Sequence, residues 1–256
     1  MITSIKHKDS EKGLDDLFDY SADDVETARE IGVKGRSKVQ CVIEELEEFI
    51  AKLERDNLMI NDPTSILTPK ELDVFVTVSE VFKDNVQYKH NFSHFLDVLI
   101  RNSYNEGNNN FYLDFTNLHF LHYLLHHFRA KEDNPLKMTV CGNFGSFIAK
   151  ASTNVNLVLD GNCNFLFGQK SSNLTAYVTG NVGRSFGFKS DNMTAIIGGD
   201  YGDNFKYGFN NSTVYVNSNL EKSGFLKISK KTTPCDVKDD PLYQKLIQDF
   251  EGRIER

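Results

Sequence analysis

Six of the seven histidines fall in two short segments, and this clustering is the first feature of the sequence that suggests chemistry. One segment, expected to be helical, places His119, His122 and His126 at positions i, i+3 and i+7, with His127 beside them. Two imidazoles on one helix face can hold zinc when a third ligand comes from elsewhere. His119, His122 and His126 are therefore the candidate metal ligands.

The surroundings of these histidines favour a simpler interpretation. No HExxH or comparable ligand pattern accompanies them. The expected helix has an apolar face that leaves the histidines largely on the opposite side, formed by Leu118, Leu121, Leu125 and Phe128. His90 and His94 form a second i, i+4 pair of the same kind. We expect a polar helix face and no bound cofactor.

Three carboxylates, Asp191, Asp200 and Asp203, lie near Arg184 and Lys189 in the sequence. They are similar to the acidic and basic groups that polysaccharide lyases carry on a β-helix. Catalytic loops on such folds are long, whereas the repeats described below have no insertions. We therefore assign no catalytic residue.

Two further residue types have structural explanations. The glycines of the second half do not form a G-x-x-x-x-G-K-[ST] loop and no helix follows them, so they are expected to form corners and not a phosphate cradle. Cys163 falls at an inward position, where a cysteine behaves as a small apolar residue.

The formal net charge of −7 is unevenly distributed. Residues 1–135 hold 15 Lys and Arg against 25 Asp and Glu, whereas residues 136–230 hold 9 against 5. The second part is mildly basic, but it lacks the dense Lys/Arg clusters of nucleic-acid-binding domains. We expect a protein partner or a homo-oligomer, and no nucleic-acid partner.

The N-terminal sequence has no apolar core of a signal peptide, and no stretch of about 18 apolar residues occurs. The four cysteines form no Cys-x-x-Cys pair and are expected to be reduced thiols. These features predict a cytoplasmic protein without membrane contact.

Residues 1–135 are predicted to be mainly helical. Apolar positions recur every three or four residues from Val39 to Leu53 and again from Phe92 to Ile100. A short capped helix is expected from Ser21. The segment "TPKE" predicts a capping box, with Thr68 as the cap and Pro69 at the first helical position. "FYLDF" is compatible with a short strand, and "TNLHFLHYLLHHFRA" is expected to be a helix.

A repeat begins at Leu136. Cutting the chain every nineteen residues gives LKMTVCGNFGSFIAKASTN, VNLVLDGNCNFLFGQKSSN, LTAYVTGNVGRSFGFKSDN, MTAIIGGDYGDNFKYGFNN and STVYVNSNLEKSGFLKISK, without insertion or deletion. A fixed period of this length indicates a solenoid. A left-handed hexapeptide β-helix needs multiples of six residues, so the period of nineteen disfavours it.

Each column of this alignment has a physical meaning. Positions one, three and five are apolar and alternate with their neighbours, as in a strand with one buried face. Positions nine and thirteen return to the interior. Position seven forms the corners, where the chain needs positive φ or has no room for a side chain: Gly142, Gly161, Gly180 and Gly199. Positions eight and nineteen are expected to form hydrogen-bonded ladders along the rod: Asn143, Asn162, Asn181, Asp200, Asn154, Asn173, Asn192 and Asn211.

These residues resemble the GXGXG repeat found in the C-terminal domain of glutamate synthase and in one of the subunits of formylmethanofuran dehydrogenase. The matching positions are Gly142, Asn143 and Gly145; Gly161, Asn162 and Gly168; Gly180, Asn181, Gly183 and Gly187; and Gly199, Asp200 and Gly202. The resemblance covers residues 136–230. It implies a right-handed β-helix that serves as a structural element beside catalytic parts.

The sequence as a whole predicts an α+β protein in three parts. A mainly helical region (1–135) precedes a single-stranded right-handed parallel β-helix of about five coils (136–230), and a linker with a C-terminal helix follows (231–256). We expect the C-terminal helix to cover the far end of the solenoid or a side, and the helix at 117–128 to close the other end. The expected function is a non-catalytic scaffold or protein-interaction module, such as a subunit of a larger enzyme assembly. The alternatives are a small metalloprotein that uses the histidine cluster and a carbohydrate-active enzyme on the solenoid face.

Overall fold

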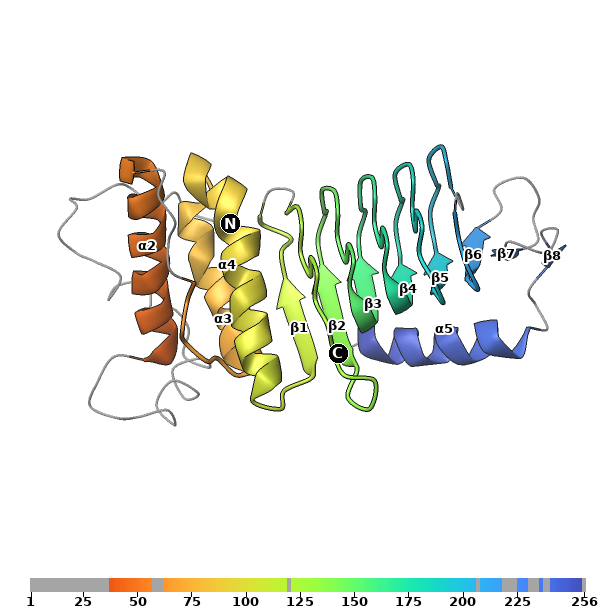
Figure 1. Ribbon diagram of the computed structural model, residues 1–256, viewed down its shortest axis with the longest axis horizontal. Coiled ribbons are helices and arrows are strands. Elements are labelled where there is room, and N and C mark those ends of the chain that lie inside the picture. The colour runs from red at the N-terminus through yellow and green to blue at the C-terminus, as the bar shows by residue number, and fades with distance from the viewer. Residues whose placement is uncertain are drawn as a thin grey trace, which may run out of the picture.

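The computed structural model describes residues 37–56, 62–118, 121–205, 208–217, 225–229, 235–236 and 240–254. Within these residues, four α-helices and a short 3-10 helix accompany one eight-stranded sheet (Figure 1). The helical elements are α2 (Lys38–Asp56), α3 (Pro69–Ser79), η2 (Glu80–Phe82), α4 (Val86–Asn105) and α5 (Pro241–Ile254). The strands are β1 (Asn110–Asp114), β2 (Leu136–Cys141), β3 (Thr153–Asp160), β4 (Ser172–Val178), β5 (Thr194–Ile197), β6 (Thr213–Asn217), β7 (Phe225–Ser229) and β8 (Cys235–Asp236). The predicted α+β class is confirmed.

The strands β1 to β6 are all parallel neighbours and form a β-solenoid of about four turns. Its regular part repeats every 19 residues, because Leu136 pairs with Val155 and Val155 with Leu174. The expected inward positions of the strands are buried, including Met138, Leu157, Ala176 and Ala195. The predicted burial of positions one, three and five is confirmed, but position four is buried too, as at Val158 and Ile196, so the prediction of a single buried face is wrong.

The last of the five predicted coils is not formed. Strand β7 runs antiparallel to β6, with Thr213 opposite Ser229, and β8 continues the sheet in the same antiparallel manner. Among the described residues, the strand that follows β6 therefore runs back beside it and adds no further parallel strand to the solenoid. The pairing with β7 occupies the hydrogen-bonding groups of β6 on the side away from β5, so β6 is not the edge strand of the sheet.

The predicted helix at 117–128 is wrong. Its described residues, 117–118 and 121–128, contain no α-helix, and Leu121 instead forms a parallel bridge with Phe144 of the first regular turn. Tyr123, Leu125 and His127 have φ between 55° and 64°, which a right-handed helix does not allow. Together with β1, this segment forms an additional turn that precedes the repeat.

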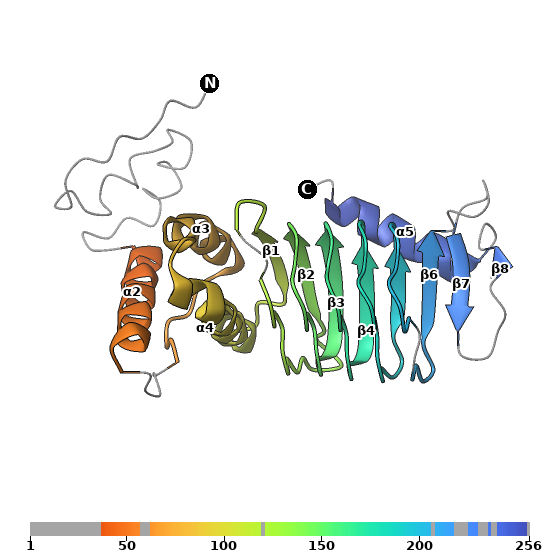
Figure 2. The ribbon, with the colours of Figure 1, turned by 90° about the horizontal axis from the view of Figure 1, so that it is seen from above.

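The helices α2, α3 and α4 pack together at the end of the solenoid where β1 lies (Figure 2). Their core includes Phe49, Phe75 and Phe95, which are in ring contact, and it is continuous with the apolar interior of the solenoid. The predicted capping box is confirmed: the Thr68 hydroxyl accepts from the Glu71 amide, and the Glu71 carboxylate accepts from the Thr68 amide. The short helix expected from Ser21 lies outside the described residues.

The helix α5 lies along the outer face of the sheet (Figures 1 and 2). Its Phe250 is buried against Val158, Ile196 and Tyr215, and its ring stacks on Tyr177 at 5.3 Å. These strand residues all occupy position four of the repeat, so α5 packs on the apolar column that this position forms on the outer face. The C-terminal helix was expected to cover either the far end of the solenoid or one of its sides, and the structure shows it on a side. No described helix has the length and apolar character needed to cross a bilayer.

Candidate interaction surface

The corner glycines allow neighbouring coils to approach closely. Gly161 has a φ of 145°, and a Cβ there would collide with the carbonyl oxygen of Gly142 in the preceding coil. At Gly180 and Gly199, φ is not in the positive region, but a Cβ would meet the amide oxygens of Asn162 and Asn181. Both physical reasons expected for these glycines therefore occur.

The asparagines of position nineteen are linked by their side chains. Asn173 Nδ2 donates to Asn154 Oδ1 at 2.9 Å, and Asn192 Nδ2 donates to Asn173 Oδ1 at 2.6 Å. Asn211 departs from this pattern, since its Nδ2 lies 3.3 Å from Asp191 Oδ1. All four asparagines have φ between 44° and 57°, a left-handed conformation that asparagine tolerates better than most residues.

The column at position eight uses a different bond. Asn162 Oδ1 accepts from the backbone N–H of Asn181 at 2.8 Å, and Asn181 Oδ1 accepts from the N–H of Asp200 at 2.7 Å. Asn143 and Asn162 add a side-chain to side-chain bond, at 2.7 Å. In this column the amide oxygens mainly satisfy backbone N–H groups at the corner.

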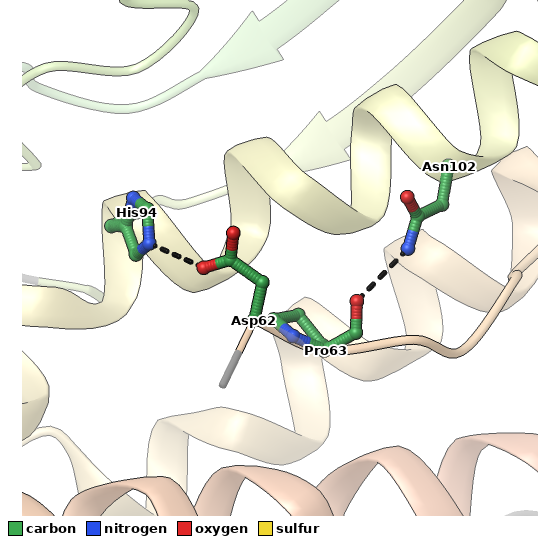
Figure 3. Close-up of polar contacts among 4 residues, drawn as sticks. All are labelled: Asp62, Pro63, His94 and Asn102. Atoms are coloured by element: carbon green, nitrogen blue, oxygen red, sulfur yellow. Dashed lines mark hydrogen bonds and ion pairs between the residues drawn. The ribbon is translucent and has the colours of Figure 1, made fainter. Parts of the chain in front are cut away.

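The described histidines do not form a metal-ligand set. Among the described residues, no group of three or more histidine, cysteine or acidic side chains could hold a metal ion. His122 Nδ1 accepts from the backbone N–H of Ser146 at 3.0 Å, whereas His126 lies in the turn that follows, 4.2 Å from the His127 ring. His119 lies outside the described residues. His94 of the second pair bonds to Asp62 Oδ1 at 2.8 Å, beside the Asn102–Pro63 contact (Figure 3).

The carboxylates considered for catalysis also lie apart in the repeat. Asp191, Asp200 and Asp203 occupy positions eighteen, eight and eleven, and the described residues include no acidic cluster of three. Cys163 is buried, and burial raises the pKa of its thiol. A thiol with a raised pKa is a poor nucleophile, in agreement with the inward position expected for it.

A row of partly exposed aromatic rings crosses the turns between the strands. Tyr123 of the first turn stacks on Phe147 of the next, with ring centres 4.9 Å apart and an interplanar angle of 5°. Phe147 meets Phe165 of the following turn edge to face at 6.0 Å. Tyr123 retains 46% of its accessible surface, and the two phenylalanines are half-buried. We call Tyr123, Phe147 and Phe165 the aromatic ridge.

Positive side chains accompany the ridge. Lys150 Nζ lies 4.7 Å from the ring centre of Phe147, and the Arg184 guanidinium lies 5.7 Å from that of Phe165. Both distances permit cation–π attraction. The pKa of His126, which touches Tyr123, is lowered by burial and by the positive charges of its neighbours, so this imidazole is neutral near pH 7.

The ridge is hidden in the sequence because its rings do not share a column. Phe147 occupies position twelve of its block, and Phe165 occupies position eleven of the next. Tyr123 belongs to the segment whose leucine spacing predicts a helix. The one available signal is the positive charge balance of residues 136–230.

Comparison of this chain with family models, curated proteins and solved structures finds no match.

Proposed function

We propose that this chain is a non-catalytic protein-interaction module, a scaffold or a subunit of a larger assembly, that binds its partner through the aromatic ridge. The observation that carries the proposal is the row formed by Tyr123, Phe147 and Phe165, which runs along three successive turns. Aromatic side chains and arginine are enriched in protein interfaces, where they contribute most of the binding energy.

The other surfaces of the solenoid support this choice. The outer sheet face carries α5 over β3 to β6. One end of the rod packs against α2–α4, and the other ends in the antiparallel strands β7 and β8. The ridge, which spans the first turn and two regular turns, keeps apolar area exposed.

The charge around the ridge indicates the chemistry of the partner. Lys150 and Arg184 lie on the rings, and Lys189 lies 5.2 Å from the ring centre of Phe188 in the same part of the coils. A protein segment with apolar side chains flanked by carboxylates would complement such a surface. The partner is either another protein or a second copy of this chain.

The proposal includes the finer features expected from the sequence. We propose that the solenoid winds to the right, as connections between parallel strands nearly always do, and that it is a divergent repeat of the GXGXG kind. The fifth coil is not part of the proposal. A cytoplasmic location remains a prediction of the sequence.

Quantitative affinity capture from the native cell, with the full chain as bait, tests this function. The double variant Phe147→Ala/Phe165→Ala removes the ridge, and Leu242→Ala removes an exposed side chain of α5 as the matched control. We expect a partner that the wild type and the control retain and that the double variant loses by at least about tenfold, since buried aromatic anchors each contribute on the order of 2 kcal/mol. Equal capture by all three proteins, or no enriched partner together with a monomeric wild type in sedimentation, would overturn the proposal.

A further inference from the structure

A cavity of about 540 Å³ lies where α3, the first strands of the sheet and the C-terminal end of α5 meet. Its volume is in the range of small-molecule sites, roughly 300–1,000 Å³. The residues that line it come from parts of the chain far apart in sequence: Lys70 and Asp73 from α3, Lys137 from β2, and Asp249 and Arg253 from α5.

Three cations line this cavity: Lys70 from α3, Lys137 from β2 and Arg253 from α5. Within the part of the chain that the structure describes, none of Lys70, Lys137 and Arg253 makes a salt bridge with a carboxylate. Three cations on the wall of one cavity give it positive charge, to which an anion is attracted.

Arg253 is the best-positioned of the three. Its Nη2 donates to the backbone oxygen of Met138 at 2.8 Å and lies 3.4 Å from that of Asn156, which fixes the guanidinium against the strands. Burial lowers its pKa, so the half-buried charge is held at a cost. A fixed, partly desolvated guanidinium is well suited to bind phosphate or carboxylate, because little entropy is lost on binding.

Two acidic residues, Asp73 and Asp249, also line the cavity, so the three cations exceed them by one formal charge, and the negative charge of Asp249 attracts the Arg253 guanidinium. Asp73 Oδ1 accepts from the backbone N–H of Asp114 at 3.3 Å, and its pKa is raised by burial and by the charge of Asp114. The remaining wall includes uncharged polar side chains from three strands, Asn110, Thr139 and Asn156. Amide and hydroxyl groups of this kind bind the hydroxyls of small ligands.

We propose that this cavity binds a small hydroxylated organic anion, with its phosphate or carboxylate group held by Lys70, Lys137 and Arg253. The polar side chains of the strands would contact the hydroxyl groups. Because α3, the sheet and α5 all contribute, the ligand would fix α5 in place on the solenoid. This site is separate from the aromatic ridge, and neither proposal depends on the other.

Isothermal titration calorimetry of the full chain at constant ionic strength tests the site, with glycerol 3-phosphate, inorganic phosphate and citrate as probes. We expect saturable binding of at least one probe by the wild type. In Lys70→Gln/Lys137→Gln the affinity should fall at least about tenfold with an unchanged melting temperature, because both lysines lie on the wall without ion-pair partners among the described residues. The charge-matched control Lys131→Gln/Lys245→Gln changes exposed lysines that do not line the cavity.

The outcomes separate cleanly. Preference for the two phosphates assigns the acid group as phosphate, and preference for citrate assigns it as carboxylate. The proposal is overturned if no probe binds the wild type saturably up to about 10 mM. A dissociation constant above that concentration means a binding free energy weaker than about 3 kcal/mol. Equal affinity in both double variants would overturn it as well.

Discussion

The first turn of the solenoid, residues 110–135, and the regular turns after Leu136 reach the same cross-section by different means. In the regular turns, each coil is held by the next through backbone bonds such as Gly180 N to Gly161 O, at 2.9 Å, and through the asparagine columns. The same glycines and amides recur every 19 residues, so each coil forms the same contacts with the coil that follows it.

The first turn has a coil on one side only, and side chains of α4 occupy the other side. The Asp97 carboxylate accepts from the backbone N–H groups of Leu125, at 2.7 Å, and His126, at 3.0 Å. Arg101 donates to the backbone oxygens of His126 and His127. The Tyr104 hydroxyl accepts from the Lys131 amide and donates to the carbonyl of Asn134.

This difference shows what the repeat contributes. The backbone groups at an open solenoid end need partners, and α4 provides them with side chains where the regular turns provide them with a neighbouring coil. The first turn therefore does not need the glycines and asparagines of the repeat. Its leucines, Leu121, Leu124 and Leu125, are still buried in the same core. We expect mutations to affect the two regions through different bonds.

The largest effect is expected in the regular turns, from Gly161→Ala. A Cβ at this position would overlap the carbonyl oxygen of Gly142, and φ is 145°, so the two coils must separate. We expect a loss of more than about 4 kcal/mol in the free energy of unfolding, comparable to severe overpacking combined with backbone strain. Urea unfolding gives this value. Gly252→Ala in α5, where a Cβ meets nothing within 4 Å, is the control and should be neutral or slightly stabilising.

In the first turn, the Asp97 carboxylate, which accepts from the amides of Leu125 and His126, should make the free energy of unfolding depend on pH. Burial raises the pKa of Asp97 to about 7 despite its two backbone hydrogen bonds, compared with roughly 3.9 in an unfolded chain. The folded state then binds the proton more tightly, so this group stabilises the fold fully below about pH 4 and loses that contribution as pH rises to about 7. The difference in unfolding free energy between wild type and Asp97→Asn should therefore change by a few kcal/mol over this range.

Urea unfolding of both proteins at several pH values between about 4 and 8, the range that spans the two pKa values, measures that difference. If the unfolding free energies of wild type and Asp97→Asn changed with pH in parallel, the raised pKa of the buried Asp97 carboxyl would be contradicted. Asp97→Ala is the companion variant: it leaves the amides of Leu125 and His126 without an acceptor and should cost about 2–5 kcal/mol near pH 7.

The smallest effect is expected in the outer asparagine column. Asn173→Ala removes two exposed side-chain hydrogen bonds and places alanine at a φ of 49°, for an expected loss of about 1–2 kcal/mol. Asn173→Gly removes the same bonds but tolerates the backbone, so it should cost less than Asn173→Ala. Thermal unfolding compares them. A glycine variant as unstable as the alanine variant would assign the cost to the hydrogen bonds and not to the conformation.

The first turn and the regular turns also differ in how well the sequence predicts them. The regular turns are predictable because the period of 19 places like residues in register, which identifies the buried strand positions and the corner glycines. The cap at Thr68 is predictable because its two hydrogen bonds are local in sequence.

The first turn is not predictable in the same way because its spacing differs from that of the repeat. The chain takes seven residues from Asp114 to Leu121, but three from the paired Cys141 to Phe144. The shift hides the relation to the repeat, and the leucine spacing of this segment matches a helix as well as a coil. The bonds from Asp97 and Arg101 that decide between the two come from residues 25 or more positions away in sequence.

The candidate surface is less predictable than the fold. The histidines attract attention because a helix would place them on one face, whereas in the described residues no group of three or more possible ligands forms around them. The ridge depends on rings whose positions shift by one residue between coils, and only the packing of the turns brings them together.

The most direct test of the proposed function is a cross-link from the ridge itself. The photoreactive residue p-benzoylphenylalanine at position 147 or 165 retains an aromatic ring there, and the same residue at position 242 reports on the exposed surface of α5. On irradiation in the native cell, we predict one defined cross-linked protein, or a cross-linked dimer, from positions 147 and 165 and not from 242. Absence of any product from the two ridge positions, or the same products from all three, would contradict the account.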